Sequence, residues 1–332
     1  MKQEDLLHIK NQLQNISAGQ LTIAHHTLSA QDSTLFLNQF LAKTKGKGKV
    51  EAYVLFPGIE ASYNIFCAPE VAFRHKASSS ILELFYCHSG RVGWHMKGET
   101  EIYLGAGDMT AHSSTCCADS AMMFPLGYAE GISFSVDFQC LETKYPEILK
   151  EANIDLKKLK DMFCSEKPVS IPACPETDGI FIPLYSVPST LRMPYLKLKI
   201  QELLLYLHNL GIKRKEQTQY FSQQTELIKE IHSLLTEHLD HRFTIEDLSK
   251  RYLLNTSTIK EVFKGVYGLP IARYMKEFRI RKAMELLRDT NDSIAIISRQ
   301  VGYESQSKFT KAFKDITQTL PSEYRKKYRI SH

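Results

Sequence analysis

The sequence predicts an α+β protein in which an N-terminal jelly-roll β-domain with accessory helices precedes an all-α domain containing two helix-turn-helix units. Residues 50–140 break into short strand-like runs, whereas residues 226–329 show helical periodicity almost throughout. From residue 220 onward there are 20 Lys and Arg against 14 Asp and Glu, while the preceding part has 22 against 23. The excess positive charge therefore lies in the helical part, as expected for a module that binds a polyanion.

The β-domain is predicted from its punctuation. Between residues 50 and 140, apolar or alternating runs are separated by Gly, Pro, Asn or Asp at intervals of roughly ten residues. The runs ILELFYCHSGRV and TEIYLGAGD fit two successive hairpins. Many short strands without helices between them are typical of a jelly roll, so we assign residues 1–212 to one domain with its barrel at about 50–140.

Two helical regions are expected after the barrel, at about 144–163 and 194–210, separated by a proline-rich stretch that should be irregular. The second helix has apolar residues at heptad spacing: Leu196, Ile200, Leu203, Leu207 and Leu210. Because the pattern covers only about two heptads, it fits either a helix packed on the β-domain or an antiparallel dimer helix. The polar residues 213–222 are predicted to link this domain to residues 223–332.

Composition narrows the class of protein. No run of about 18 apolar residues is present, so we expect no transmembrane helix. The first residues are mixed and charged and lack the apolar region of a signal peptide. The seven cysteines show neither C-x-x-C nor zinc-finger spacing, which favours reduced thiols in a cytoplasmic protein, with a redox sensor as the alternative.

The first helix-turn-helix unit is predicted at about 244–267. Thr244 is placed to cap a helix, with Asp247 three residues later, and that helix should end near Tyr252. After a short turn, Thr256 or Ser257 should cap a second helix that stops at Gly268. Two short helices joined by about four residues form the helix-turn-helix pattern, whose second helix enters the major groove of DNA.

The same arrangement recurs at about 293–316. Ser293 should cap the first helix, Gly302 marks the turn and Ser305 should cap the second helix. Phe309 stands 50 residues after Ile259, at the equivalent core position. Between the units, residues 270–288 form one continuous amphipathic pattern, which predicts a connecting helix.

The segments RYMKEFRIRKAMELL, SIAIISRQVGYESQSKFTKAFK and PSEYRK resemble the DNA-binding domain of the AraC/XylS family. The resemblance spans about 100 residues, with Ser298 and Gln318 as departures from the usual Ala and Gly. It implies a sequence-specific transcription regulator, commonly an activator, that works with RNA polymerase. Members of the family often have an N-terminal cupin-like domain, which binds a small effector or mediates dimerisation. A homodimer and an effector of unknown identity are therefore expected, while no membrane partner is.

The residues expected to contact DNA lie on the outward faces of the two recognition helices. They are Ser257, Thr258, Lys260, Glu261 and Lys264 in the first helix and Gln306, Ser307, Lys308, Thr310 and Lys311 in the second. Gln306 is a candidate reader of adenine, Lys260 or Lys311 of guanine, and Glu261 of cytosine. Each fits a phosphate contact or a solvated helix face equally well. The basic end is predicted to contact the DNA backbone through Arg325, Lys326 and Lys327.

The effector pocket is predicted inside the barrel, with barrel core as the alternative role of the same side chains: Phe85, Trp94, Tyr103 and Met122. A metal-dependent cupin enzyme would need about three converging ligands. The candidates are loosely spaced and include no H-x-H pair: His75, Glu83, His88, His95 and His112. We therefore expect no metal, no cofactor and no enzymatic activity. An effector-independent DNA binder is the remaining alternative, against which the large non-basic N-terminal domain argues.

Overall fold

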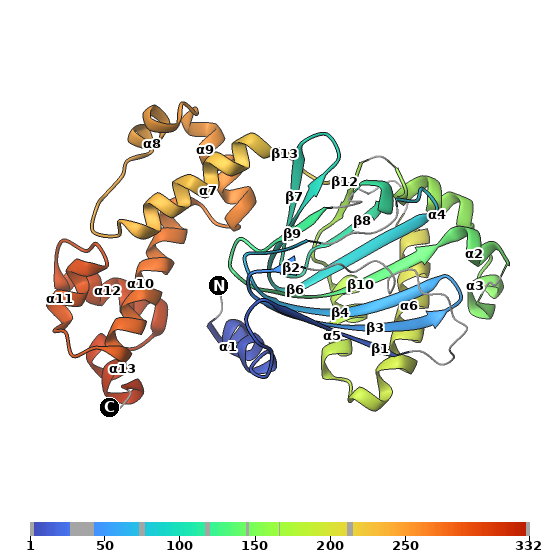
Figure 1. The fold of residues 1–332 in the computed structure, drawn as a ribbon, viewed down its shortest axis with the longest axis horizontal. Coiled ribbons are helices and arrows are strands. Elements are labelled where there is room, and N and C mark those ends of the chain that lie inside the picture. The colour runs from blue at the N-terminus through green and yellow to red at the C-terminus, as the bar shows by residue number, and fades with distance from the viewer. Residues whose placement is uncertain are drawn as a thin grey trace. The chain divides into compact units, whose positions relative to one another are not determined.

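The computed structural model describes residues 3–26, 43–72, 77–116, 120–143, 146–165, 167–210 and 215–329. The chain forms two compact units that divide between Ser222 and Gln223 (Figure 1). The first unit is rich in strands and the second is helical. The predicted α+β architecture is confirmed.

Two β-layers make up the first unit and share the long strand β6 (Ile81–Met96). The first layer runs in the order β1 (Gln20–His26), β3 (Lys47–Phe56), β4 (Ile59–Cys67), β10 (Ala129–Asp137), β6, β8 (Met109–Ser113), β11 (Val169–Ile171) and β12 (Lys215–Glu216). The second contains β2 (Lys43–Thr44), β5 (Glu70–Ala72), β9 (Ala121–Met123), β6, β7 (Thr100–Gly105) and β13 (Tyr220–Phe221). Neighbouring strands pair antiparallel in both layers, except that β1 and β3 in the first layer pair parallel.

The strand β6 changes layer at Gly90. Its first half pairs with β10 and β8, and its second half pairs with β7 and β9. Gly90 has a φ of 80°, and a Cβ there would lie 2.3 Å from the carbonyl oxygen of Tyr128. Only glycine fits this bend, which curls the sheet into a barrel-like shape.

Side chains fill the interior of the curled sheet. Phe85 and Trp94 meet edge to face with ring centroids 5.0 Å apart, and Met122 packs in the same buried cluster. Tyr103 is buried and donates its hydroxyl to Glu101. The four side chains thus pack as barrel core, the alternative that the sequence had left open, and the effector pocket that they were expected to line stays a prediction.

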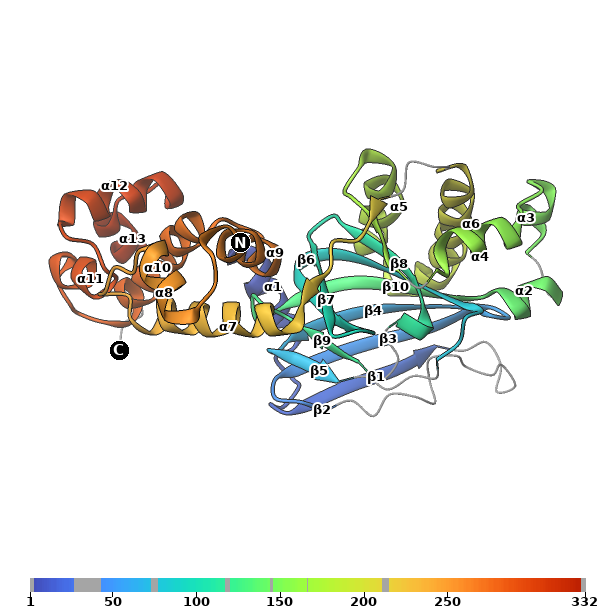
Figure 2. The same cartoon turned by 90° about the horizontal axis from the view of Figure 1, so that it is seen from above.

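Helices cover the other face of the first layer (Figure 2). They are α2 (Phe138–Thr143), α3 (Glu147–Glu151), α4 (Leu156–Phe163), α5 (Pro175–Ser186) and α6 (Arg192–Asn209), with short 3-10 turns at Ser114–Cys116 and Ser189–Leu191. Alternation along the strands separates the two faces. On β6, Leu84 and Tyr86 pack toward the helices, whereas Phe85 and Cys87 point into the barrel.

The heptad seam of α6 lies inside its own chain. Leu196, Ile200, Leu203 and Leu207 have no exposed surface and pack in the core between the helices and the sheet, with Leu210 partly buried against it. The dimer-helix interpretation of these residues is therefore wrong. Sequence spacing shows that one face of a helix is apolar, but not which surface covers it.

The helix α5 contradicts the expectation of an irregular proline-rich stretch. Pro175 occupies its first turn, where the missing N–H has no helical partner. Pro183 lies within the helix and frees the carbonyl of Gly179, which accepts a hydrogen bond of 3.1 Å from Lys199 Nζ. Burial of Ile180 and Phe181 against the sheet stabilises the helix despite both prolines.

Part of the predicted linker is fastened to the β-domain. Lys215–Glu216 pairs with β11 as β12, and Tyr220–Phe221 pairs with β7 as β13. Between them, Gln217 donates to the carbonyl of Tyr103 at 3.1 Å. Residues 215–221 therefore belong structurally to the first unit and do not form a free tether.

The second unit is built from helices. They are α7 (Ser222–Glu237), which begins at the unit boundary, α8 (Ile245–Tyr252), α9 (Thr256–Tyr267), α10 (Ile271–Asp289), α11 (Ile294–Gln300), α12 (Gln306–Thr317) and α13 (Pro321–Tyr328). The connecting helix expected at 270–288 is α10, offset by one residue. At the other end of the chain, α1 (Gln3–Gln12) and β1 were not predicted from the sequence.

Candidate nucleic-acid interface

The first helix-turn-helix unit consists of α8 and α9. Thr244 Oγ1 accepts a hydrogen bond of 3.1 Å from the N–H of Asp247, and Asp247 Oδ2 accepts one of 3.0 Å from the N–H of Thr244. These reciprocal bonds confirm the predicted cap of α8. They also lower the pKa of Asp247, because they stabilise its ionised form.

The cap of α9 differs from the prediction. Asn255, not Thr256 or Ser257, accepts the bond from the N–H of Thr258 at 2.7 Å. Ser257 reinforces this cap by donating its hydroxyl to Asn255 Oδ1 at 2.6 Å. All three residue types favour the position, so the sequence left the choice to the backbone of the preceding turn.

The second unit consists of α11 and α12. As predicted, Ser293 accepts from the N–H of Ile296 at 3.2 Å, and Ser305 accepts from the N–H of Lys308 at 3.3 Å. Gly302 in the turn has a φ of 79°, and a Cβ there would lie 1.9 Å from the carbonyl oxygen of Leu239. The turn between α11 and α12 therefore requires glycine.

The two recognition helices α9 and α12 repeat one plan at an offset of 50 residues. Ile259 and Phe263 in α9 correspond to Phe309 and Phe313 in α12, and all four are fully buried. Gly268 and Gln318 end the two helices in the left-handed conformation, with φ values of 81° and 59°. Gln318 thus adopts the conformation in which glycine is more common.

The side chains predicted to contact DNA lie away from these cores. Most are exposed, and two are half-buried, Thr258 and Thr310. Lys308 forms an ion pair of 2.7 Å with Glu304, one turn away. Within the part of the chain that the structure describes, Lys260, Glu261 and Lys311 form no ion pair. The two helices thus present polar side chains that are available to a nucleic acid.

Arg325 departs from its predicted role. Its Nε donates to the carbonyl of Leu287 at 3.3 Å, and its Nη2 donates to the carbonyl of Asp292 at 2.6 Å. The guanidinium thus joins α13 to the end of α10 and to the segment that follows. Lys326 and Lys327 are exposed beside it and stay available for DNA.

A second arginine plays a structural role that sequence reasoning missed. Arg279 on α10 donates to the carbonyls of Leu239 at 3.1 Å and Gly302 at 3.4 Å. It therefore holds the loop after α7 against the turn between α11 and α12. Its position in a long amphipathic helix resembled that of any solvated arginine, so periodicity alone gave no signal.

The core of the first helix-turn-helix unit contains a histidine. His232 on α7 stacks on Tyr267 with ring centroids 4.3 Å apart, and its Nε2 lies 2.8 Å from the hydroxyl of Tyr274. Burial lowers the pKa of His232 to about 4, and the charge of Arg281 acts in the same direction. The imidazole is therefore neutral at physiological pH and serves as part of an aromatic core.

The side chains considered as metal ligands are dispersed. His95 Nδ1 lies 3.1 Å from Glu101, and Glu83 accepts a hydrogen bond of 2.6 Å from Ser135. His88 stacks on an aromatic ring of α5. Of the two other candidates, His75 lies outside the described ranges and His112 is buried. Among the described residues, no three His, Cys, Asp or Glu side chains are grouped to hold a metal ion.

Comparison with known proteins places the similarity in the second unit. A family model described as a helix-turn-helix domain matches residues 248–327. Over 101 residues the chain is 28% identical to the transcriptional activator RhaR of Mannheimia succiniciproducens, covering 30% of this chain and 37% of that protein. Over 99 residues it is 30% identical to the arabinose operon regulatory protein of Escherichia coli, covering 30% of this chain and 34% of that protein.

A shorter relative is covered more completely. The TetD protein of transposon Tn10 from Escherichia coli is 30% identical over 112 residues, which are 33% of this chain and 81% of that protein. By contrast, the match spans about a third of the two longer relatives. No helix among the described residues is both long enough and apolar enough to cross a membrane.

Proposed function

This chain belongs to the AraC/XylS family of regulators through its C-terminal domain, and we propose that it regulates transcription by binding double-stranded DNA with α9 and α12. The observation that supports this proposal is the repeat. Two capped helices, 50 residues apart, bury equivalent side chains and expose polar ones. Each helix suits a major groove, and α10 joins the two units as one continuous helix.

The exposed side chains suggest how the two helices divide the work. On α9, Lys260, Glu261 and Lys264 combine donors with one acceptor, so this helix can match a pattern of base edges. On α12, three lysines are exposed, Lys308, Lys311 and Lys314, which favours phosphate contacts as well. Gln306 opens α12, where a side chain points toward the base edges.

The first unit is proposed to sense a small molecule and to make the protein a homodimer. It contains most of the chain but none of the excess positive charge, so it adds little to DNA affinity. A regulator of this kind acts in the cytoplasm and contacts RNA polymerase at its promoters. A ligand that binds one conformation of the first unit better than another would shift the balance between the two.

Selection from a random duplex library by the full chain tests the DNA-binding proposal. We expect enrichment of one site with two half-sites, followed by tight binding in fluorescence anisotropy that random DNA displaces poorly. Lys260→Ala and Lys311→Ala should each weaken that binding, whereas Lys10→Ala, in the first unit, should not. Enrichment of no sequence, or equal displacement by random DNA, would indicate an effector-independent architectural binder instead.

A further inference from the structure

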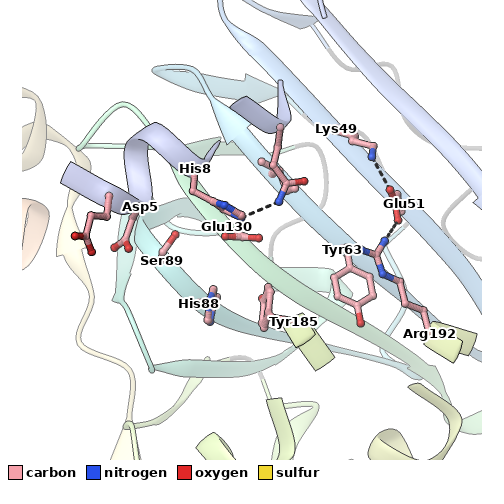
Figure 3. A pocket seen from close by; sticks show the side chains of 13 residues that line it. Asp5, His8, Lys49, Glu51, Tyr63, His88, Ser89, Glu130, Tyr185 and Arg192 are labelled. Carbon is pink, nitrogen blue, oxygen red and sulfur yellow. Dashed lines mark hydrogen bonds and ion pairs between the residues drawn. The ribbon is translucent and has the colours of Figure 1, made fainter. Parts of the chain in front are cut away.

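A cavity of about 330 Å³ lies on the helix-covered face of the first layer (Figure 3). Strands β3, β4, β6 and β10 form its floor, while α1, α5 and α6 supply its walls. The cavity lies outside the barrel interior, which the core fills. A small ligand bound to this domain thus has room in this cavity.

One wall of the cavity is aromatic. Tyr185 on α5 stacks on His88 with ring centroids 3.7 Å apart and meets Tyr63 edge to face at 6.0 Å. The guanidinium of Arg192 lies 4.9 Å from the centre of the Tyr63 ring. The Tyr63 ring therefore already forms a cation–π contact with Arg192. The three rings together present a surface on which an apolar or cationic group can lie.

The basic side chains of the lining are already paired. Glu51 accepts from Arg192 and from Lys49, the latter at 2.6 Å. The single carboxylate of Glu51 offsets one of the two positive charges on that side of the cavity. An anionic ligand would have to compete with Glu51 for both bases.

The opposite side holds an acid without a partner. Glu130 on β10 is 7% exposed, and its side chain makes no hydrogen bond or ion pair with any described residue. Burial raises the pKa of Glu130, while the charged and titratable groups of α1 act in opposite directions: His8 lowers this pKa and Asp5 raises it. Nearby, the Ser89 and Tyr185 hydroxyls are buried and have no hydrogen-bond partner among the described residues.

A buried carboxylate without a cation is unfavourable, because the protein replaces only part of its hydration. The lining as a whole contains Glu4, Asp5, Glu51 and Glu130 against Lys49 and Arg192. A ligand cation beside Glu130 would supply the missing charge, and the two free hydroxyls would accept its remaining N–H groups or donate to a ligand oxygen.

We propose that this cavity binds a small organic ammonium compound, with its nitrogen against Glu130 and Asp5 and its body against Tyr63, His88 and Tyr185. The proposal deepens the proposed function, since it names the chemical class and the place of the effector. Only the regulatory role of the ligand rests on the proposed function, because binding of the ligand to this cavity does not require DNA.

Thermal unfolding and calorimetry of the full chain test it, with phenethylamine, putrescine and choline as cationic probes. Phenylethanol and phenylacetate are the neutral and anionic counterparts of the first probe. We expect at least one ammonium probe to raise the Tm. Phenylethanol and phenylacetate should not raise it. The proposal is overturned if no ammonium probe binds at millimolar concentration, or if phenylethanol binds as tightly as phenethylamine.

Variants locate the site. Glu130→Gln should weaken binding of the ammonium probe at least tenfold and raise the Tm of the ligand-free chain, since it removes an unpaired buried charge. Glu83→Gln is the matched control: Glu83 is half-buried on β6, bonded to Ser135 and outside the cavity lining, so binding should not change. Retained binding in Glu130→Gln would overturn the proposal.

The same variants separate this proposal from the proposed function. Without probe, Glu130→Gln should bind the selected DNA site with unchanged affinity. If the chain binds ammonium probes but selects no DNA sequence, the cavity stands and the regulatory function fails. If it selects DNA but binds none of the probes, the regulatory function stands and the ligand class is wrong.

Discussion

The two helix-turn-helix units share a backbone plan and differ in what surrounds it. Both recognition helices begin at a side-chain cap, bury an aromatic residue at the same position and end in a left-handed residue. The first unit packs its helix on a histidine and tyrosine cluster, whereas the second packs Phe309 and Phe313 against Tyr303 and Tyr324. The repeat therefore conserves geometry but not chemistry within one chain.

That difference teaches which properties of such a unit are local. Caps, turns and core positions follow the chain and recur at a fixed offset. The side chains that pack behind each recognition helix, and with them the response to pH, depend on residues brought in by other helices. Four experiments test this distinction, beginning with the largest expected effect.

Removing the equivalent aromatic core residues should cost similar free energies. Phe263→Ala and Phe313→Ala should each lower the free energy of unfolding by about 3–5 kcal/mol, because both side chains are fully buried. Urea unfolding followed by far-UV circular dichroism measures the loss. Fluorescence of Trp94, the only tryptophan, reports on the β-domain of residues 1–222 alone. Phe221→Ala, at an exposed residue, is the control. A loss confined to one of the two variants would break the equivalence.

Acid should weaken the first helix-turn-helix unit through His232. Because the pKa of this histidine falls to about 4 in the folded chain, the unfolded chain takes up the proton first as pH falls. Its contribution to stability is complete above about pH 6.5 and decreases toward pH 4, by roughly 3 kcal/mol in total. Unfolding of the native chain and of His232→Gln at several pH values isolates this contribution. Parallel pH profiles of the two proteins would contradict the assignment. Neither α11 nor α12 contains a histidine.

Arg325 and Lys326 should separate stability from DNA affinity. Arg325→Ala removes the donors to two backbone carbonyls and should lower the free energy of unfolding by about 1–3 kcal/mol, with no change in the salt dependence of DNA binding. Lys326→Ala should leave stability unchanged and reduce the slope of log affinity against log salt by about one. Should Arg325→Ala alter that slope instead, the arginine contacts DNA as the sequence had predicted.

The smallest effects should come from single outward side chains. Glu261→Gln should change the preferred base at one position of the selected site, by about 1 kcal/mol, and leave the salt slope unchanged. Lys311→Ala should weaken binding to all sequences more evenly and reduce the slope. Anisotropy against a set of single-base variants measures both. A uniform loss in Glu261→Gln would place Glu261 outside base contact.

How much was predictable depends on the range of the interactions. Thr244, Ser293 and Ser305 cap helices whose amides lie within three residues, so their roles follow from neighbouring residues. The choice of Asn255 over Thr256 already depended on the exact backbone turn. Arg325 looked like part of a basic tail, because its carbonyl partners belong to residues more than 30 positions earlier.

The sequence by itself determined the class of fold, the repeated helix-turn-helix plan and the location of the excess charge, because caps, periodicity and composition act over a few residues. The tertiary structure decided what covers each apolar face: α6 packs on its own sheet, α5 forms despite two prolines, and Phe85 packs on Trp94 inside the barrel. It also decided where space remains, beside Glu130, between segments far apart in the chain. Cavities and buried charges arise from how distant surfaces meet, which no local pattern encodes.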